Sequence, residues 1–485
     1  MLIITKYAKH FLILFAVIFI YNCNSSDVPN NNIVQPIYKD LDSIKTNKKL
    51  RALINYSSTS YFLYKGNPMG FEYELLKKYA DYIDVELEII PIKNMDSVFT
   101  DLNNGKGDIV AANLTITKER LQQTAFTSPI LITQQVLIQR KPENWKSLSK
   151  KKLNEKLITS SIDLTDKTVV VREGSAFNSR LKNLSNEIGG TINIKTVPGE
   201  ITMEQLIEQV ANGDINYTIA DKNIARVNQW HYPNIDANLT ISSDQQIAWA
   251  IRSNSDSLTT SINNWLKEYQ KTKKFKMLVV KYFKNQKSFK NRISNDYYTL
   301  TSGEISPYDD LIKKYAPKIN WDWELLASLI YQESHFNNEA IGWGGAFGLM
   351  QFMPTTGARF GVNESSSPEE NIKAGVKYIK YLEKMWINSV PDSLERIKFV
   401  LASYNVGPGH VQDAQKLARK YSDNPALWKD VGYYLLHKSE PAYYKDAIVK
   451  HGYCKGYITY EYVNEIFERH EHYKNIVSES NLAKK

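Results

Sequence analysis

The hydrophobic pattern changes near Pro307, and this change constrains the fold more than any other feature of the sequence. From Leu50 to about residue 285, short apolar strands alternate with helical stretches, which is typical of α/β structure. After Pro307 the pattern is helical, with loops rich in Gly and Pro, up to about Tyr473. At roughly 150 residues per domain, the 485 residues predict about three compact units. The sequence therefore predicts two α/β stretches followed by a mainly α domain.

The expected elements and boundaries follow from this pattern. Strands are expected at 51–55, 85–91, 109–112, 136–139, 168–171, 217–221 and 246–251. Helices are expected at 73–82, 95–103 and 118–123, and an amphipathic helix follows the last strand, with Ile262, Trp265, Leu266 and Tyr269 at helical spacing. The expected segments are a signal sequence at 1–22, a tether at 23–48, an α/β module at 49–285 with a Lys-rich insertion at about 142–165, a linker at 286–304, a helical domain at 305–475 and a tail at 476–485.

The start of the chain is typical of an export signal. Lys6 and Lys9 precede an apolar run from Phe11 to Tyr21, which is too short to span a bilayer of ~30 Å as a helix. Cys23 follows this run and resembles the lipidated cysteine of a bacterial lipoprotein. An uncleaved anchor with an incidental cysteine is the alternative. Both interpretations place the protein on the periplasmic side of a membrane, and the lipoprotein interpretation favours the outer membrane.

Charge and cysteine usage exclude several classes of function. The net charge of +9 suits an anionic polymer, but it is spread along the chain without a dense basic block, so we expect no nucleic-acid partner. Cys454 is the only other cysteine, so a lipidated Cys23 would leave neither a disulfide nor a Cys-based zinc site. The eight His residues show no metal-ligand spacing, and no phosphate-binding glycine loop is present. We expect no cofactor and no catalytic metal.

One carboxylate stands out in the helical domain. Leu326, Leu329, Ile330 and Glu333 follow the i, i+3, i+4, i+7 spacing and share one helical face. A carboxylate on an apolar stripe is unfavourable unless it is paired or functional, and desolvation raises its pKa towards that of a general acid. A Glu frayed into solvent at the end of the helix is the alternative.

Two glycine-containing segments follow this helix. Residues 342–354 form a Gly-rich stretch with Trp343 and Phe347, and residues 402–409 place Tyr404 and Asn405 before a second Gly-rich turn. Glycine lets a backbone approach a ligand closely. Each aromatic side chain could stack on a sugar, although a core position is the more ordinary interpretation for any one of them.

Taken in order, Glu333-Ser334, the Gly-Leu-Met-Gln run at 348–351, Ser403-Tyr404-Asn405 and Tyr462-Val463 resemble the motifs of the soluble lytic transglycosylase domain, a lysozyme-like helical fold that cleaves peptidoglycan. The family commonly has Ala where Ser403 stands. The resemblance implies Glu333 as catalytic acid and base. It implies substrate binding by Ser334, Gly348, Met350, Gln351, Tyr404, Asn405 and Tyr462.

A single carboxylate fits this chemistry. Most glycosidases use two, and the motifs contain no second Asp or Glu. The resemblance implies that Glu333 protonates the bond between N-acetylmuramic acid and N-acetylglucosamine, and that the muramyl C6 hydroxyl then attacks C1 and leaves a 1,6-anhydro end. A lysozyme-type hydrolase, with water as the acceptor, is the alternative.

The α/β module contains one arginine at a helix start. Thr117 is a suitable N-cap, which places Arg120 in the first helical turn, where a cation opposes the helix dipole. An ion pair with a ligand carboxylate would offset this unfavourable interaction. A solvated surface arginine is the alternative, and spacing alone favours it.

The wider pattern resembles the periplasmic solute-binding proteins for amino acids, family 3. The resemblance rests on the Gly-Lys-Gly-Asp run at 105–108, the segment 114–120, the Phe-Thr-Ser-Pro run at 126–129, and Gly213-Asp214 ahead of Asp221. It implies a two-lobed module that binds an amino acid or a muropeptide. It implies that Thr115 and Arg120 bind an α-carboxylate, that Asp221 binds an α-amine, and that Tyr56 and Tyr61 flank the ligand.

Together, the two resemblances predict an α/β two-lobed binding module followed by a lysozyme-like domain. They imply glycan strands of peptidoglycan, an amino-acid or muropeptide ligand and a lipid-anchored membrane as partners. The binding module is expected to modulate catalysis in proteins of this organisation. A non-catalytic binding or sensing lipoprotein remains the alternative from another class.

Overall fold

The computed structural model describes residues 35–295, 297–300 and 303–483. The expected signal sequence, Cys23 and the first part of the expected tether lie outside these residues. Among the described helices, none combines the length and the apolar character that crossing a bilayer requires.

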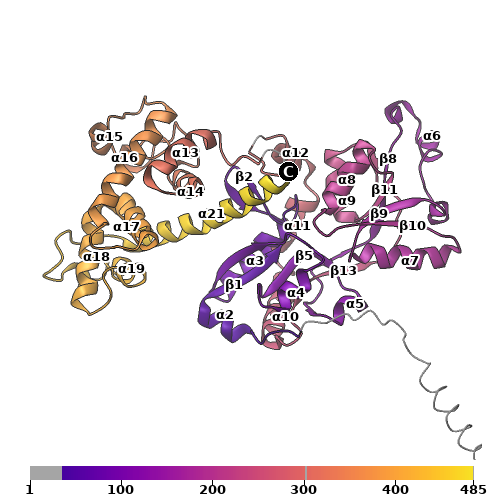
Figure 1. The fold of residues 1–485 in the computed structure, drawn as a ribbon, viewed down its shortest axis with the longest axis horizontal. Helices are drawn as coiled ribbons and strands as arrows, with labels where there is room; N and C mark the ends of the chain where they lie inside the picture. The colour runs from indigo at the N-terminus through magenta and orange to yellow at the C-terminus, as the bar shows by residue number, and fades with distance from the viewer. Residues whose placement is uncertain (1–34, 296, 301–302, 484–485) are drawn as a thin grey trace, which may run out of the picture. The chain divides into compact units, whose positions relative to one another are not determined.

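The first lobe is built on a sheet with the strand order β4-β1-β5-β13-β6, with β7 also paired to β13 (Figure 1). Strand β1 is parallel to β4 and β5, whereas β13 is antiparallel to β5. A short hairpin of β2 and β3 accompanies the sheet. Its strands are β1 (Lys49–Ile54), β4 (Glu86–Pro91), β5 (Ile109–Thr115), β6 (Ala125–Phe126), β7 (Leu131–Thr133) and β13 (Gln245–Ile251), and the hairpin is β2 (Phe62–Tyr64) and β3 (Asn67–Met69). Its helices are α2 (Leu41–Asn47), α3 (Phe71–Tyr82), α4 (Val98–Asn103), α5 (Lys118–Leu121), α10 (Asp256–Tyr269) and α11 (Lys273–Phe283).

The second lobe has its own sheet, with the strand order β10-β9-β11-β8-β12. The chain enters this lobe between β7 and β8 and leaves it between β12 and β13, so the two lobes are joined by two crossings. Its strands are β8 (Gln135–Arg140), β9 (Thr168–Arg172), β10 (Asn193–Val197), β11 (Tyr217–Asp221) and β12 (Ile235–Asp236). Its helical elements are η1 (Trp145–Ser147), α6 (Lys150–Asn154), η2 (Ser161–Leu164), α7 (Ala176–Ile188), α8 (Met203–Asn212) and α9 (Lys222–His231). The predicted two-lobed α/β module is confirmed.

The remaining domain is helical, as predicted, and helix α14 lies at its centre. Most residues of α14 are buried, so the helix packs on nearly every side rather than along the single stripe that the spacing predicted. The long α21 packs against it. The elements of the domain are α13 (Asp309–Tyr315), η3 (Ala316–Ile319), α14 (Trp323–Ser334), η4 (Trp343–Gly345), α15 (Pro354–Phe360), α16 (Pro368–Trp386), α17 (Ser393–Val406), α18 (Pro408–Lys420), α19 (Trp428–Leu436), α20 (Pro441–Tyr444) and α21 (Gly456–Ala483).

Some expected boundaries differ from the structure. The end of the expected tether is folded, because the Asp40 carboxylate accepts hydrogen bonds from the backbone N–H groups of Leu41, Ser257 and Leu258 and so joins the starts of α2 and α10. The expected linker contains α12 (Gln286–Ile293), and the expected tail continues α21. The helix expected at 95–103 starts only at 98, because the segment before it is bonded to the second lobe at Gly199.

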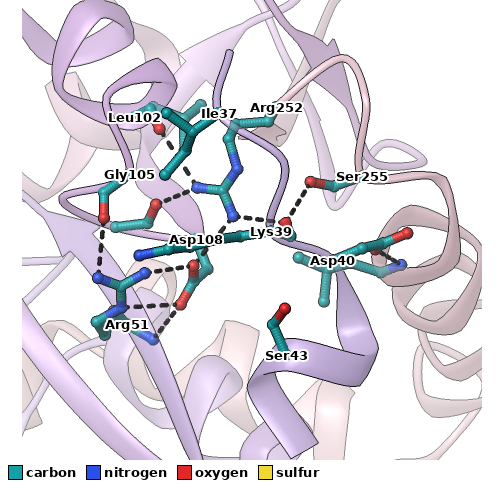
Figure 2. Close-up of polar contacts among 12 residues, drawn as sticks. Ile37, Lys39, Asp40, Ser43, Arg51, Leu102, Gly105, Asp108, Arg252 and Ser255 are labelled. Carbon is teal, nitrogen blue, oxygen red and sulfur yellow. Dashed lines mark hydrogen bonds and ion pairs between the residues drawn. The ribbon is translucent and has the colours of Figure 1, made fainter. Parts of the chain in front are cut away.

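A buried cluster of charges connects the end of the expected tether to the first sheet (Figure 2). The Arg252 side chain is 0% exposed and forms an ion pair of 3.0 Å with Asp108, which is 2% exposed. Asp108 also pairs with Arg51 at 2.8 Å. Arg252 donates further hydrogen bonds to the carbonyl oxygens of Lys39 and Leu102, at 2.9 and 3.3 Å. One carboxylate therefore neutralises two guanidinium groups, one of which has no contact with water.

We expect Asp108→Asn to lower the free energy of unfolding by about 3–5 kcal/mol, because it leaves the buried Arg252 without a counter-charge. Urea denaturation followed by circular dichroism measures this change. The matched control is Asp84→Asn, which removes an exposed ion pair with Lys48 and should change stability little. Equal effects of the two substitutions would contradict this role of the cluster.

Candidate functional site

The carboxyl group of Glu333 lies at the end of α14, where the helix leaves the core. Tyr462 on α21 donates a hydrogen bond to its Oε1. Burial raises the pKa of Glu333 to about 7, although the hydrogen bond from Tyr462 opposes this shift by stabilising the carboxylate. Desolvation is therefore the stronger of the two effects, and Glu333 can hold a proton near neutral pH.

The chain turns sharply after this carboxyl group. His335 and Phe336 both have positive φ angles, 52° and 59°, which are unfavourable for residues with a side chain. The Ser334 hydroxyl donates to the Ile330 carbonyl oxygen at 3.2 Å, so this side chain bonds back to its own helix. The turn ends the helix at Ser334 and leaves the side chain of Glu333 partly exposed in the last helical turn.

The loop at 348–351 is fixed by close contacts. Gly348 has φ 76°, and a Cβ atom there would lie 2.2 Å from Nδ2 of Asn371. Asn371 accepts a hydrogen bond of 2.8 Å from the Met350 N–H, and Gln351 Nε2 donates to the carbonyl oxygens of Ala340 and Gly348 at 2.9 Å. The requirement for glycine is thus steric as well as conformational. In this structure the Gln351 amide holds the loop together.

Tyr404 and Asn405 are neighbouring residues of α17, and they contact the loop at 348–351 and α21. The Tyr404 hydroxyl donates to the Met350 carbonyl oxygen at 2.7 Å, and Tyr404 lies near enough to Glu333 for the carboxylate to help raise the pKa of the phenol. The exposed Asn405 accepts a hydrogen bond of 2.7 Å at Oδ1 from Thr459. This bond orients the amide, so that its nitrogen is available to a substrate acceptor.

The structure also accounts for Ser403. Its hydroxyl is buried and accepts a hydrogen bond of 2.9 Å from the indole N–H of Trp386. An Ala at this position would leave that buried donor without its partner. The serine is therefore a local adjustment of the core rather than a change at the site.

The three candidate sugar-stacking aromatics differ in exposure. Phe347 is buried in the core, and the Tyr404 ring is half-buried beside Tyr378. Trp343 is 92% exposed. Of these three rings, Trp343 has the free face that stacking requires.

In the module, Arg120 is not the solvated surface residue that spacing alone favoured. It is 9% exposed, and its guanidinium group donates to the Thr115 carbonyl oxygen at 2.9 Å. Thr117 caps α5 through a hydrogen bond from the Arg120 N–H, as predicted. Burial lowers the pKa of Arg120 to about 10, with Arg172 adding to the shift and Asp221 opposing it.

Asp221 lies at the end of β11 and faces the first lobe. Its Oδ2 accepts a hydrogen bond of 2.7 Å from Asn113, a residue at the end of β5 with φ 51°. Its Oδ1 is buried and has no hydrogen-bond partner among the described residues. Burial raises the pKa of Asp221 to about 7, while Arg120 and Asn113 hold it down. The structure therefore brings Arg120 and Asp221 together across the lobes.

The two candidate tyrosines lie elsewhere. Tyr61 is fully buried, and its hydroxyl pairs with Nδ1 of His472 on α21 at 2.7 Å. The Tyr56 hydroxyl donates to Oγ1 of Thr299. These phenols thus contact segments that follow the module in sequence, rather than Arg120 and Asp221.

Sequence reasoning did not identify Asn113 or Thr459 as functional. Asn113 differs from the small residue frequent in the solute-binding family, and this departure was the available signal. Thr459 carries no such signal, because its contact with Asn405 joins residues 54 positions apart.

Comparison with known proteins agrees with this architecture. Residues 49–285 match the family model of bacterial extracellular solute-binding proteins, family 3, and residues 310–427 match that of the transglycosylase SLT domain. Part of the chain also aligns with the crystal structure of an ancestral amino acid-binding protein, a precursor of cyclohexadienyl dehydratase. That alignment has 26% identity and a TM-score of 0.41, and it covers 50% of this chain and 98% of the other.

Two similar proteins cover most of the chain. The membrane-bound lytic murein transglycosylase F of Desulfosudis oleivorans is 32% identical over 88% of this chain and 90% of its own length. The protein of the same name from Yersinia pestis is 33% identical over 88% of this chain and 84% of its own length. The chain therefore belongs to the membrane-bound lytic murein transglycosylase F family, with a solute-binding module ahead of an SLT domain.

Proposed function

We propose that this lytic transglycosylase cleaves the β-1,4 bond between N-acetylmuramic acid and N-acetylglucosamine in peptidoglycan, with Glu333 as its acid and base. The position of Glu333 in the last turn of α14, with its carboxyl group bonded to Tyr462, carries the proposal. Burial there raises its pKa to about 7, which gives a proton donor near neutral pH. Tyr462 supports this role, since its hydrogen bond stabilises the carboxylate once the proton has left.

The reaction proceeds in two proton transfers. Glu333 donates its proton to the glycosidic oxygen, the C1–O bond breaks, and positive charge develops at muramyl C1, where the 2-acetamido group stabilises it. The Glu333 carboxylate then removes the proton of the muramyl C6 hydroxyl while that oxygen bonds to C1. The product carries a 1,6-anhydro ring, the acid is regenerated, and no water is consumed.

The other site residues hold the sugar and the reacting groups. Asn405, oriented by Thr459, donates to the acetamido carbonyl oxygen, and Tyr404 keeps the loop carbonyl of Met350 in place. Gly348 and Gln351 give the loop the shape that admits the glycan, and Ser334 supports the helix end that presents Glu333.

A hydrolase with the same fold is the second candidate. The motifs that contain Glu333, the 348–351 loop and Tyr404-Asn405 hold no second Asp or Glu, whereas a two-carboxylate glycosidase needs a second acidic group beside the first. This observation favours capture by the substrate hydroxyl over attack by water.

The pH dependence of turnover tests the role of Tyr462. Turnover of the wild-type enzyme should fall as the pH rises above about 7, where Glu333 loses its proton. Tyr462→Phe removes a hydrogen bond that favours the carboxylate, so the pKa rises and the decline moves to higher pH, while kcat falls roughly 10–100-fold. The control is Tyr460→Phe on the same helix, where the ring packs on Trp428. A decline that stays at the wild-type pH in Tyr462→Phe would contradict this role.

Mass spectrometry of digested peptidoglycan tests the reaction. Muropeptides should carry anhydro ends about 18 Da lighter than hydrated ones, because no water is added. Glu333→Gln should lower turnover by roughly 10²–10⁴-fold. Glu339→Gln, which changes an exposed carboxylate six residues later, is the control. Reducing ends in the digest would assign the enzyme to the hydrolases instead.

We also propose that the cleft of the module binds an amino acid or the peptide part of a muropeptide. Arg120, supported by Thr115, takes the α-carboxylate, and the unpaired Oδ1 of Asp221 takes the α-ammonium group. Tyr56 and Tyr61 are left out of this proposed site, because their hydroxyls bond to Thr299 and His472. Bound ligand is then able to modulate catalysis if it favours one arrangement of the domains.

Calorimetric titration with free amino acids and stem peptides tests the cleft. Arg120→Ala should weaken binding at least tenfold, because a buried charge-assisted pair is lost. The control is Arg226→Ala, an exposed arginine of the second lobe. Unchanged binding in Arg120→Ala would remove this assignment.

A lipid on Cys23 would anchor the enzyme on the periplasmic side of the outer membrane. The lipoprotein-like signal and the membrane-bound relatives support this proposal. Incorporation of labelled palmitate into the wild type but not into Cys23→Ala would test it.

A further inference from the structure

Arg172 is a partly buried cation in the module for which no role has been assigned. It ends β9, as Asp221 ends β11, and these two neighbouring strands are parallel, with Val170 opposite Thr218. The two side chains therefore belong to the same carboxyl edge of the second sheet. Ligands of open α/β sheets bind at this edge.

The same edge faces the candidate ligand residues of the first lobe. Asn113 bonds to Asp221 across the lobes at 2.7 Å, and Arg172 lies close enough to Arg120 to lower the pKa of that guanidinium group. Two guanidinium groups and one carboxyl group thus share the cleft.

The protein leaves polar atoms of this group without partners. Nε of Arg172 is buried and has no hydrogen-bond partner among the described residues, and the same holds for Oδ1 of Asp221. Asp96 is the acidic residue that stabilises the charge of Arg172, but it is exposed and its Oδ2 accepts the Gly199 N–H at 2.8 Å. No ion pair within 4.0 Å joins Asp96 to Arg172 in the described part of the chain. A partly buried guanidinium group with one unpartnered nitrogen gains a hydrogen bond and a counter-charge when an anion binds to it.

A simple amino acid satisfies only part of this arrangement. Its carboxylate pairs with Arg120, and its ammonium group pairs with Asp221, which leaves Arg172 unpaired. A basic side chain would add another cation beside Arg120 and Arg172, and a neutral one would leave Nε of Arg172 without a counter-charge.

We infer that the cleft selects an α-amino acid that carries a second carboxylate, and that this second carboxylate pairs with Arg172. The inference rests on the proposed amino-acid binding by Arg120 and Asp221 and adds the ligand class. Free glutamate and the D-glutamate of wall peptides share this chemistry.

Calorimetry on the detergent-solubilised full-length protein tests the inference. L-Glutamate or D-glutamate should bind at least tenfold more tightly than the corresponding glutamine, since only the acid can pair with Arg172. The enantiomer that binds better distinguishes a free metabolite from a wall-derived ligand, and both results support the inference. L-Arginine should bind more weakly than either amide.

Arg172→Gln separates a specificity role from a structural one. It should weaken glutamate binding about tenfold and leave glutamine binding within about twofold, so that the preference disappears. The matched control is Arg180→Gln, which lies in the same lobe and pairs with Glu187 at 2.6 Å. Thermal unfolding of both variants checks that the module is folded.

Different outcomes overturn different claims. Equal affinity of the wild type for glutamate and glutamine, or an equal loss of both ligands in Arg172→Gln, would overturn the second-carboxylate inference while leaving amino-acid binding intact. Failure of every amino acid to bind the wild type would overturn both.

Discussion

Desolvation of the Glu333 carboxyl group is the constraint on which the catalytic domain depends. Helix α14 is buried on nearly all sides, so an acid can reach a substrate only where the helix ends. The positive φ angles of His335 and Phe336 end it there. Tyr462 donates a hydrogen bond that stabilises the ionised form of Glu333. Desolvation favours the protonated acid and the hydrogen bond from Tyr462 favours the carboxylate, so the two effects together set the pKa of this group to about 7.

Among the described residues, three carboxyl groups have pKa values raised to about 7, and they differ in their partners. Glu72 is fully enclosed and accepts a hydrogen bond of 2.6 Å from the Trp249 indole, which makes it a core contact. Asp221 has a guanidinium group nearby and one unpaired oxygen, which suits a ligand cation. Glu333 has a phenol partner and an opening to solvent, which suits proton transfer. Burial alone therefore does not identify a functional site. The groups that surround each carboxyl group distinguish the three residues.

Much of the architecture follows from local sequence patterns. Apolar runs located β1, β4, β5, β8, β9, β11 and β13 but missed β6, β7, β10 and β12, whose segments are shorter or more polar. The Thr117 cap located α5, because this signal lies within a few residues. The predicted end of the tether was wrong, because the Asp40 carboxylate accepts hydrogen bonds from N–H groups more than 200 positions away. Residue spacing likewise could not place Tyr61 against His472, or identify the hydrogen bond between Tyr462 and Glu333. Tyr462 was found through family resemblance alone, because a contact over 129 positions leaves no local pattern.

The bond between Asn113 and Asp221 bears on how a ligand can enter the closed cleft. Asn113 occupies Oδ2 and leaves Oδ1 free, so a ligand ammonium group can bind without breaking the contact between the lobes. Binding would also return Asp221 to its ionised form, because a cation beside a carboxylate lowers its pKa. In the proposed binding mode, a ligand of matching charge would pair with the atoms of Arg172 and Asp221 that have no partner among the described residues. Selectivity would then come from the unpaired charged groups that a poorly matched ligand leaves in the site, rather than from the number of contacts it makes.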